Sequence, residues 1–109
     1  MQRLFVYGTL APGRPNAHVL EEIGGSWQSA SVWGRLHQAG WGAELGYPGM
    51  TLDEAGEEIK GFLFSSDNLL NHWERLDEFE GEDYERIATL AKVDDGSSAE
   101  TFVYVLKRK

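Results

Sequence analysis

The sequence has 109 residues, of which 41% are hydrophobic and 12% aromatic, so it is long enough for one domain with a packed core and too short for two. It contains no cysteine, which excludes a disulfide scaffold, a thiol nucleophile and any site that needs cysteine ligands. The formal net charge of −8 disfavours nucleic acid as a partner, because a polyanion would be repelled.

The first predicted strand, residues 3–7, lies in the segment MQRLFVYG. This segment carries one arginine and a short apolar run, which is not the pattern of a secretory signal, and no later segment is long enough to cross a bilayer. We therefore expect a cytoplasmic protein with one domain over residues 1–109 and no membrane partner. The oligomeric state is not indicated.

Hydrophobic periodicity predicts the remaining elements in chain order. A short helix over residues 16–23 ends at a pair of glycines, and a long strand over 26–37 alternates with period two and has a possible bend at Gly34. A loop-rich segment with a possible short strand at 43–45 follows. The later elements are a strand at 57–65, a helix at 67–79 and a hairpin of strands 84–93 and 101–106 joined by residues 94–100.

Strands thus outnumber helices, and consecutive strands often lack the crossover that a parallel sheet needs. The predicted fold class is α+β, with a mostly antiparallel curled sheet or small β-barrel and two flanking helices.

The break after the first strand is the first candidate site. Gly8 and Gly13 have the glycine spacing of a phosphate-binding loop, but Arg14 and Pro15 stand where that loop needs a lysine and a metal-binding hydroxyl, which disfavours nucleotide binding. The backbone N–H groups of residues 7–10 could instead form a donor site for a carboxylate or an oxyanion. An ordinary turn is the alternative.

The second candidate is a carboxylate at the end of the second helix. Leu69, Trp73, Leu76 and Glu80 are spaced by four, three and four residues and form one stripe, of which only Glu80 is polar. Glu80 would face the unfavourable end of the helix dipole. Partial burial and neighbouring negative charges would both raise its pKa, which suits a general base. Alternatively, the last turn frays and Glu80 enters water.

Tyr84 and Arg86 share one side of the following strand. They could line the same cavity, or Arg86 could pair with a nearby carboxylate.

The sequence supports no metal site. The three histidines, His18, His37 and His72, lack metal-ligand spacing, and the acidic run 77–83 lacks the calcium-loop pattern. No GxSxG motif places a serine nucleophile. We expect no metal and no cofactor.

Four segments in this order resemble the gamma-glutamylcyclotransferase-like family, most closely its short gamma-glutamylamine cyclotransferase type: FVYGTL, GYPG, LDEFEG followed by DYER, and FVYV in the last strand. The resemblance covers nearly the whole chain. It implies a small β-barrel with a cavity at one end, with Glu80 as the base. It also implies that the backbone of Tyr7, Gly8, Thr9 and Leu10 binds substrate and that Tyr84 and Arg86 shape the pocket.

The implied reaction converts a small γ-glutamyl amine or amide to 5-oxoproline and a free amine. The nucleophile is the substrate's own α-amine, so no serine, cysteine or metal is needed. Two other hypotheses stay open: a non-enzymatic binding module for a small carboxylate or amine metabolite, and a structural interaction domain.

Overall fold

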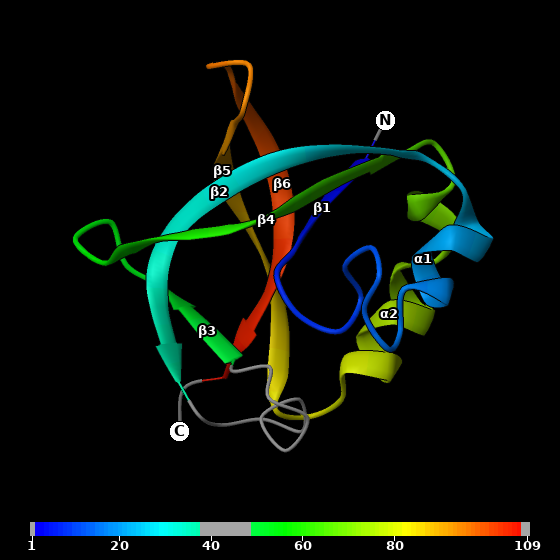
Figure 1. Cartoon of the computed structure of the whole chain (residues 1–109). Coiled ribbons are helices and arrows are strands. Elements are labelled where there is room, and N and C mark those ends of the chain that lie inside the picture. The colour runs from blue at the N-terminus through cyan, green and yellow to red at the C-terminus, as the bar shows by residue number, and fades with distance from the viewer. Residues whose placement is uncertain (1, 38–48, 108–109) are drawn as a thin grey trace.

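The computed structural model of the chain describes residues 2–37 and 49–107 (Figure 1). Six strands, two α-helices and one short 3-10 helix form within these ranges. They are β1 (Gln2–Val6), α1 (His18–Ile23), β2 (Ser26–His37), β3 (Gly49–Leu52), β4 (Glu57–Ser66), the 3-10 helix η2 (Leu69–Asn71), α2 (Trp73–Glu80), β5 (Tyr84–Val93) and β6 (Ser98–Leu106). Figure 1 shows the strands wrapped around a closed barrel, with α1 and α2 side by side on one side of it.

The barrel closes through the long strand β2. The sheet order is β3-β2-β4-β1-β6-β5, and a further pairing between β2 and β5 closes the last five of these strands. Ala30 and Ser31 of β2 pair with β5, whereas its end, Gly34 to His37, pairs with β3. All strand pairs are antiparallel except β1 and β6, which are parallel. The predicted α+β fold with a small, mostly antiparallel barrel and two helices is confirmed.

Alternate residues of the central strands supply two separate cores. On β1, Leu4 and Val6 point to the layer between barrel and helices, whereas Phe5 points to the barrel interior. The helices add Val19, Leu20, Ile23, Trp73 and Leu76 to the outer core. The second half of β4 is covered on both faces, since Leu63 lies in the barrel interior and Phe64 in the outer core, which explains the apolar run Phe62–Phe64.

The helix predicted over residues 67–79 is interrupted. The 3-10 helix η2 ends at Asn71, the following His72 has a non-helical φ of −122° and ψ of 0°, and α2 begins only at Trp73. Ser66, just before this segment, accepts a hydrogen bond from the Asn68 N–H at its hydroxyl oxygen, at 3.1 Å. Gly81 ends α2 with a φ of +82°, a conformation that favours glycine at a helix C-terminus.

The strand predictions differ at two places. The turn between β5 and β6 is shorter than the predicted 94–100, because β6 already begins at Ser98. The strand β3 was not predicted, and the predicted strand at 43–45 lies outside the described residues. A Cβ on Gly34 would lie 2.3 Å from the Thr51 carbonyl oxygen, so the close approach of β3 explains the glycine there.

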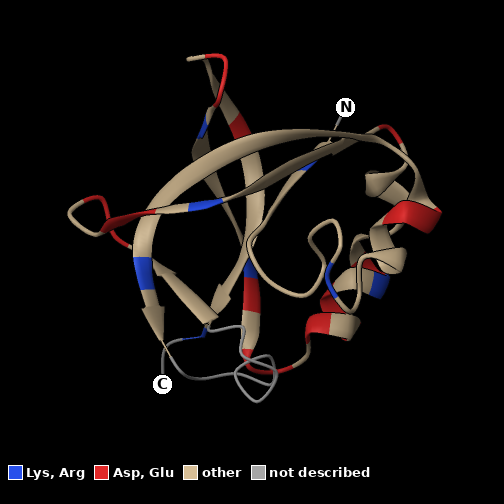
Figure 2. Ribbon diagram, in the orientation of Figure 1, with Lys and Arg blue, Asp and Glu red and all other residues tan. Residues whose placement is uncertain are grey.

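The negative charge is spread over several elements. Acidic side chains occur on both helices, in the turn after β3 and at the tip of the β5–β6 hairpin (Figure 2). No helix among the described residues is long and apolar enough to span a membrane.

Candidate active site

The chain turns immediately after β1. The Ala11 N–H donates to the Gly8 carbonyl at 3.1 Å, and the Asn16 N–H donates to the Thr9 carbonyl at 2.9 Å. Within the part of the chain that the structure describes, the N–H groups of Gly8, Thr9 and Leu10 donate none of the backbone hydrogen bonds of this turn. Gly8 does not have a positive φ, so the glycine is not required by an unusual backbone conformation.

The hydroxyl of Tyr7 connects the end of β1 to two other strands. It donates to the backbone carbonyl of Tyr104 on β6 at 2.8 Å and accepts from the backbone N–H of Met50 on β3 at 3.1 Å. Burial raises the pKa of Tyr7 well above its ordinary value, and the nearby Tyr84 and Glu80 raise it further, although the Met50 hydrogen bond opposes this. The neutral hydroxyl is therefore a fixed part of the barrel wall at neutral pH.

Glu80 occupies the last position of α2 and continues its buried stripe. Leu69, Trp73 and Leu76 of that stripe are buried, whereas Leu70 at its edge is exposed. Burial raises the pKa of the Glu80 carboxyl from 4.5 to about 7, because the site withdraws water from the charged form. The charge of Glu80 also reaches the Tyr7 and Tyr104 hydroxyls, whose pKa values it raises. The frayed, solvated position that was the alternative is not observed.

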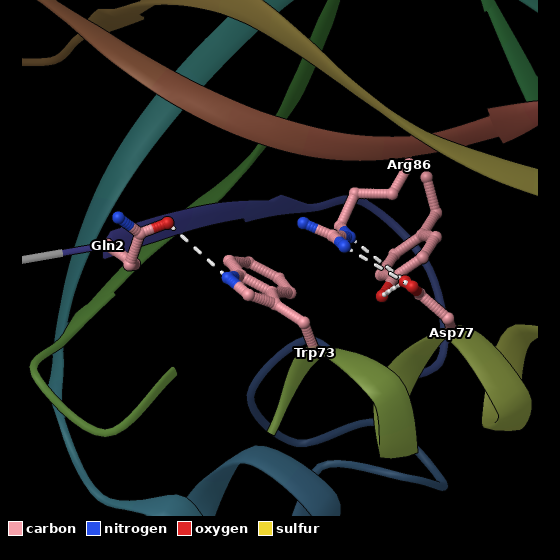
Figure 3. Close-up of polar contacts among 5 residues, drawn as sticks. Gln2, Trp73, Asp77 and Arg86 are labelled. Carbon is pink, nitrogen blue, oxygen red and sulfur yellow. Dashed lines mark hydrogen bonds and ion pairs between the residues drawn. The ribbon is translucent and has the colours of Figure 1, made fainter. Parts of the chain in front are cut away.

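Arg86 pairs with a carboxylate, as one of the two alternatives anticipated. Its Nε donates to Oδ1 of Asp77 at 2.9 Å, and its Nη2 donates to Oδ2 at 3.3 Å (Figure 3). Arg86 and the buried Tyr84 both line a surface hollow of about 510 Å³, together with Asp77 and Tyr104. Neither Glu80 nor the turn after β1 contributes to the lining of that hollow.

The fold brings the Glu80 carboxyl at the end of α2 within electrostatic reach of the Tyr7 hydroxyl after β1, although the two residues are more than seventy positions apart in the sequence. Two residues of this neighbourhood were missed by sequence reasoning. Tyr104 was visible only as part of the FVYV strand. Asp77 lies at the surface, with 45% of its side chain exposed, and the sequence alone does not reveal that it pairs with Arg86. A correct hairpin register would have identified Tyr104, because it lies directly opposite Arg86.

Among the described residues, no group of three or more histidine, aspartate or glutamate side chains is arranged to hold a metal ion. Glu80 can exchange a proton near neutral pH, whereas burial raises the pKa of Tyr7 and Tyr104 and keeps both hydroxyls protonated. The arrangement therefore offers one half-buried carboxyl with a pKa near neutrality, within electrostatic reach of the Tyr7 hydroxyl, and a strand end after Tyr7 whose N–H groups donate no hydrogen bond within the turn. Such a pair can accept a proton at one atom and stabilise an anion at another.

A comparison with protein families gives one match over almost the whole chain. The model of the gamma-glutamyl cyclotransferase, AIG2-like family matches residues 4–109. None of the curated protein sequences compared with the chain matches it.

Solved structures of similar fold come from several organisms. YkqA from Bacillus subtilis is 27% identical with a TM-score of 0.74, and the match covers 97% of this chain and 36% of YkqA. At5g39720.1 from Arabidopsis thaliana is 26% identical with a TM-score of 0.71 over 99% of this chain and 70% of that protein. An AIG2-like protein from Mus musculus is 28% identical with a TM-score of 0.65 over 96% of this chain and 76% of that protein. The chain thus spans about a third of the Bacillus protein and most of the mouse protein.

Proposed function

The chain belongs to the gamma-glutamyl cyclotransferase, AIG2-like family, and we propose that it converts a small γ-glutamyl amine or amide to 5-oxoproline and releases the free amine. The observation that carries the proposal is the burial of Glu80 beside Tyr7, with a pKa of about 7. A base with this pKa is about half ionised at neutral pH and can still return its proton within the same reaction.

The reaction follows from the position of one proton acceptor. Glu80 takes a proton from the substrate's α-ammonium group, and the freed amine attacks the γ-carbonyl carbon. A new C–N bond closes the five-membered ring, and Glu80 then gives the proton to the leaving nitrogen as the original amide C–N bond breaks. The ring nitrogen still carries one excess proton, which Glu80 accepts in turn and passes to the released amine, so that the amine leaves as an ammonium ion. The atoms balance without water or a cofactor, because the nucleophile belongs to the substrate.

The turn after β1 supplies the anion site in this proposal. The N–H groups of Gly8, Thr9 and Leu10 bind either the α-carboxylate or the oxyanion that forms at the γ-carbonyl. Tyr7 holds this turn against β3 and β6 through its hydroxyl. Tyr84 and Arg86 shape the surroundings of the pocket. Folding the substrate so that amine and carbonyl are in contact supplies much of the rate.

The test is the release of 5-oxoproline, measured by mass spectrometry, from a panel of γ-glutamyl amines, amides and dipeptides. We expect at least one compound to be converted, and we expect Glu80→Gln to lower turnover by roughly 10²–10⁴-fold, as for loss of a general base. For the ionisable wild-type base, kcat/KM should rise with pH and level off above about 7.

Glu78→Gln is the matched control, because Glu78 is exposed on the same helix and its loss changes the net charge equally. Turnover by Glu80→Gln at the wild-type rate would remove Glu80 as the base. Thermal stabilisation by a γ-glutamyl compound without any product would instead support a binding module.

A further inference from the structure

A polar cluster joins the last two turns of α2 to the β5–β6 hairpin. Both oxygens of Asp77 accept hydrogen bonds from Arg86, and Oδ1 also accepts one from the Tyr104 hydroxyl at 2.6 Å. We call Asp77, Arg86 and Tyr104 the Asp77 clamp. Figure 3 shows Arg86 and Asp77 facing each other, with Trp73 of the same helix nearby.

The strand register places both donors of the clamp together. Arg86 and Tyr104 are directly opposite each other in the antiparallel β5–β6 pair, so their side chains leave the same face of the hairpin. The Arg86 guanidinium also lies 4.4 Å from the centre of the Trp73 ring. Trp73 in turn donates from Nε1 to the side-chain oxygen of Gln2 at 3.3 Å. One short helix is thus tied to three strands of the barrel.

The helix α2 needs such ties. It has only eight residues, and His72 provides no side-chain cap at its start. Its last turns carry Asp77, Glu78 and Glu80, whose negative charges are unfavourable at a helix C-terminus. The Gly81 N–H donates to the backbone carbonyl of Asp77 at 3.1 Å, so Asp77 also closes the turn that contains Glu80.

Tyr104 extends the clamp to the candidate site. Its side chain contacts Asp77, while its backbone carbonyl accepts the hydrogen bond from Tyr7. Among the described groups around Glu80, the Tyr7 and Tyr104 hydroxyls respond to its charge, and Tyr84 acts on Tyr7. Asp77, on the helix, and Tyr7, at the turn after β1, are therefore both hydrogen-bonded to Tyr104 of β6.

We propose that Asp77 is a positioning residue: through Arg86 and Tyr104 it anchors the last turn of α2 to the hairpin and keeps Glu80 in its half-buried place near the Tyr7 hydroxyl. Arg86 then affects Glu80 indirectly, because it holds α2 in place through Asp77. The inference rests on the proposed function only for its turnover readout, because the position of Glu80 can be measured without a substrate.

The test depends on the direction in which the pKa of Glu80 changes when Arg86 is replaced. Removing the cation in Arg86→Gln would, by charge alone, raise the pKa of any nearby carboxyl. If Arg86 instead positions the helix, the loosened turn admits water and the pKa of Glu80 falls. We expect ¹³C NMR titration of the Glu80 carboxyl to show a midpoint at least one pH unit lower in Arg86→Gln, with a smaller fall in Tyr104→Phe and partial restoration in Arg86→Lys.

Arg75→Gln is the matched control, because Arg75 is on the same helix and contacts Glu22 at 3.4 Å, outside the clamp. It should leave the Glu80 midpoint unchanged. With an active substrate, Arg86→Gln should lower kcat by roughly 10²-fold with little change in KM, as for misplacement of a catalytic group.

Tyr104→Phe keeps the aromatic ring in the core, so it is the variant that tests the Asp77 clamp if Arg86→Gln does not fold. A Glu80 midpoint that rises or stays constant in every clamp variant that folds overturns the proposal. A wild-type protein that never releases 5-oxoproline, but whose Glu80 midpoint falls in the clamp variants, overturns the proposed function and supports the positioning role.

Discussion

Asp77 and Glu80 lie one helical turn apart, and their surroundings shift their pKa values in opposite directions. For Asp77, burial alone would raise the pKa, but the hydrogen bonds from Arg86 and Tyr104 outweigh it and hold the pKa below its usual value. For Glu80, burial dominates and the pKa rises to about 7. Two carboxyls on one helix can thus serve different purposes, one as a fixed anion and one as a proton carrier.

The raised pKa of Glu80 predicts a cost in stability at high pH. Below pH 4.5 the carboxyl is protonated in both the folded and unfolded chains, so it makes no pH-dependent contribution. Between about pH 4.5 and 7 the unfolded chain loses its proton first, so the free energy of unfolding falls as pH rises. The shift from 4.5 to about 7 corresponds to about 3 kcal/mol in full.

Glu80→Gln removes this titration and should therefore gain stability relative to wild type as pH rises. The free energy of unfolding, from urea denaturation at pH 4 and at pH 8, should favour the glutamine variant at pH 8 by about 1–3 kcal/mol more than at pH 4. The acid-sensitive contribution of Asp77 is present in both proteins and cancels. Equal pH profiles for the two proteins would mean that Glu80 is solvated in the folded state.

The sequence predicts Glu80 better than it predicts Asp77. A stripe with spacing four, three and four needs only the helix period, so the inward position of Glu80 followed from local geometry. The partners of Asp77 depend on the register of a distant hairpin. A turn over residues 94–100 would place Val93 opposite Thr101 and Arg86 opposite Arg108, whereas the observed register places Arg86 opposite Tyr104. An error of a few residues in turn length thus hid the clamp.

At the scale of elements, each α-helix is followed by a residue whose backbone conformation only glycine adopts without strain. Gly81 after α2 has φ +82° and ψ −169°, and Gly24 after α1 has φ +82° and ψ 131°. A Cβ on either residue would meet no atom within 4 Å, so a substitution acts through backbone strain and not through a clash. The two glycines therefore form a matched pair, of which only Gly81 adjoins Glu80.

We predict that Gly81→Ala and Gly24→Ala each lower the free energy of unfolding by about 1–3 kcal/mol, the range for a residue held in a region that glycine alone populates readily. Only Gly81→Ala should also lower turnover, by about tenfold or more, because its strain falls on the turn that contains Glu80. Thermal denaturation and initial rates of 5-oxoproline release measure the two effects. Equal losses of turnover in both variants would contradict a specific role for the end of α2.

The elements that escaped prediction are those fixed by long-range pairing. The strand β3 has four residues and includes Gly49, which gives no periodic signal, and it forms because the end of β2 offers an edge at Gly34 to His37. The break at His72 likewise follows from packing, since Leu69 and Trp73 on either side of it are both buried in the outer core. Local sequence patterns do not contain either fact.

At the scale of the whole molecule, the two cores share their strands. On β4, Phe64 belongs to the outer core and Leu63 to the barrel interior, and on β6 Tyr104 and Val103 divide in the same way. A strand displaced from the helices must therefore also disturb the barrel. The Tyr7 and Tyr104 hydrogen bond crosses between the same two layers.

This sharing predicts that the barrel and the helices unfold together as one cooperative unit, as expected for a single domain. Leu76→Ala in the outer core and Leu63→Ala in the barrel interior each remove a fully buried side chain, so each should lower the free energy of unfolding by about 2–5 kcal/mol. Both should shift the same transition, with tryptophan fluorescence and far-UV circular dichroism giving coincident curves. Leu70→Ala is the control, because Leu70 is exposed beside α2 and its loss should change stability by less than about 0.5 kcal/mol. If Leu76→Ala instead unfolded the helices in a separate early transition while the midpoint of the barrel stayed constant, the helices would not belong to the same cooperative unit. The rigidity of Glu80 on α2 would then have to come from something other than the core that α2 shares with β1 and β6.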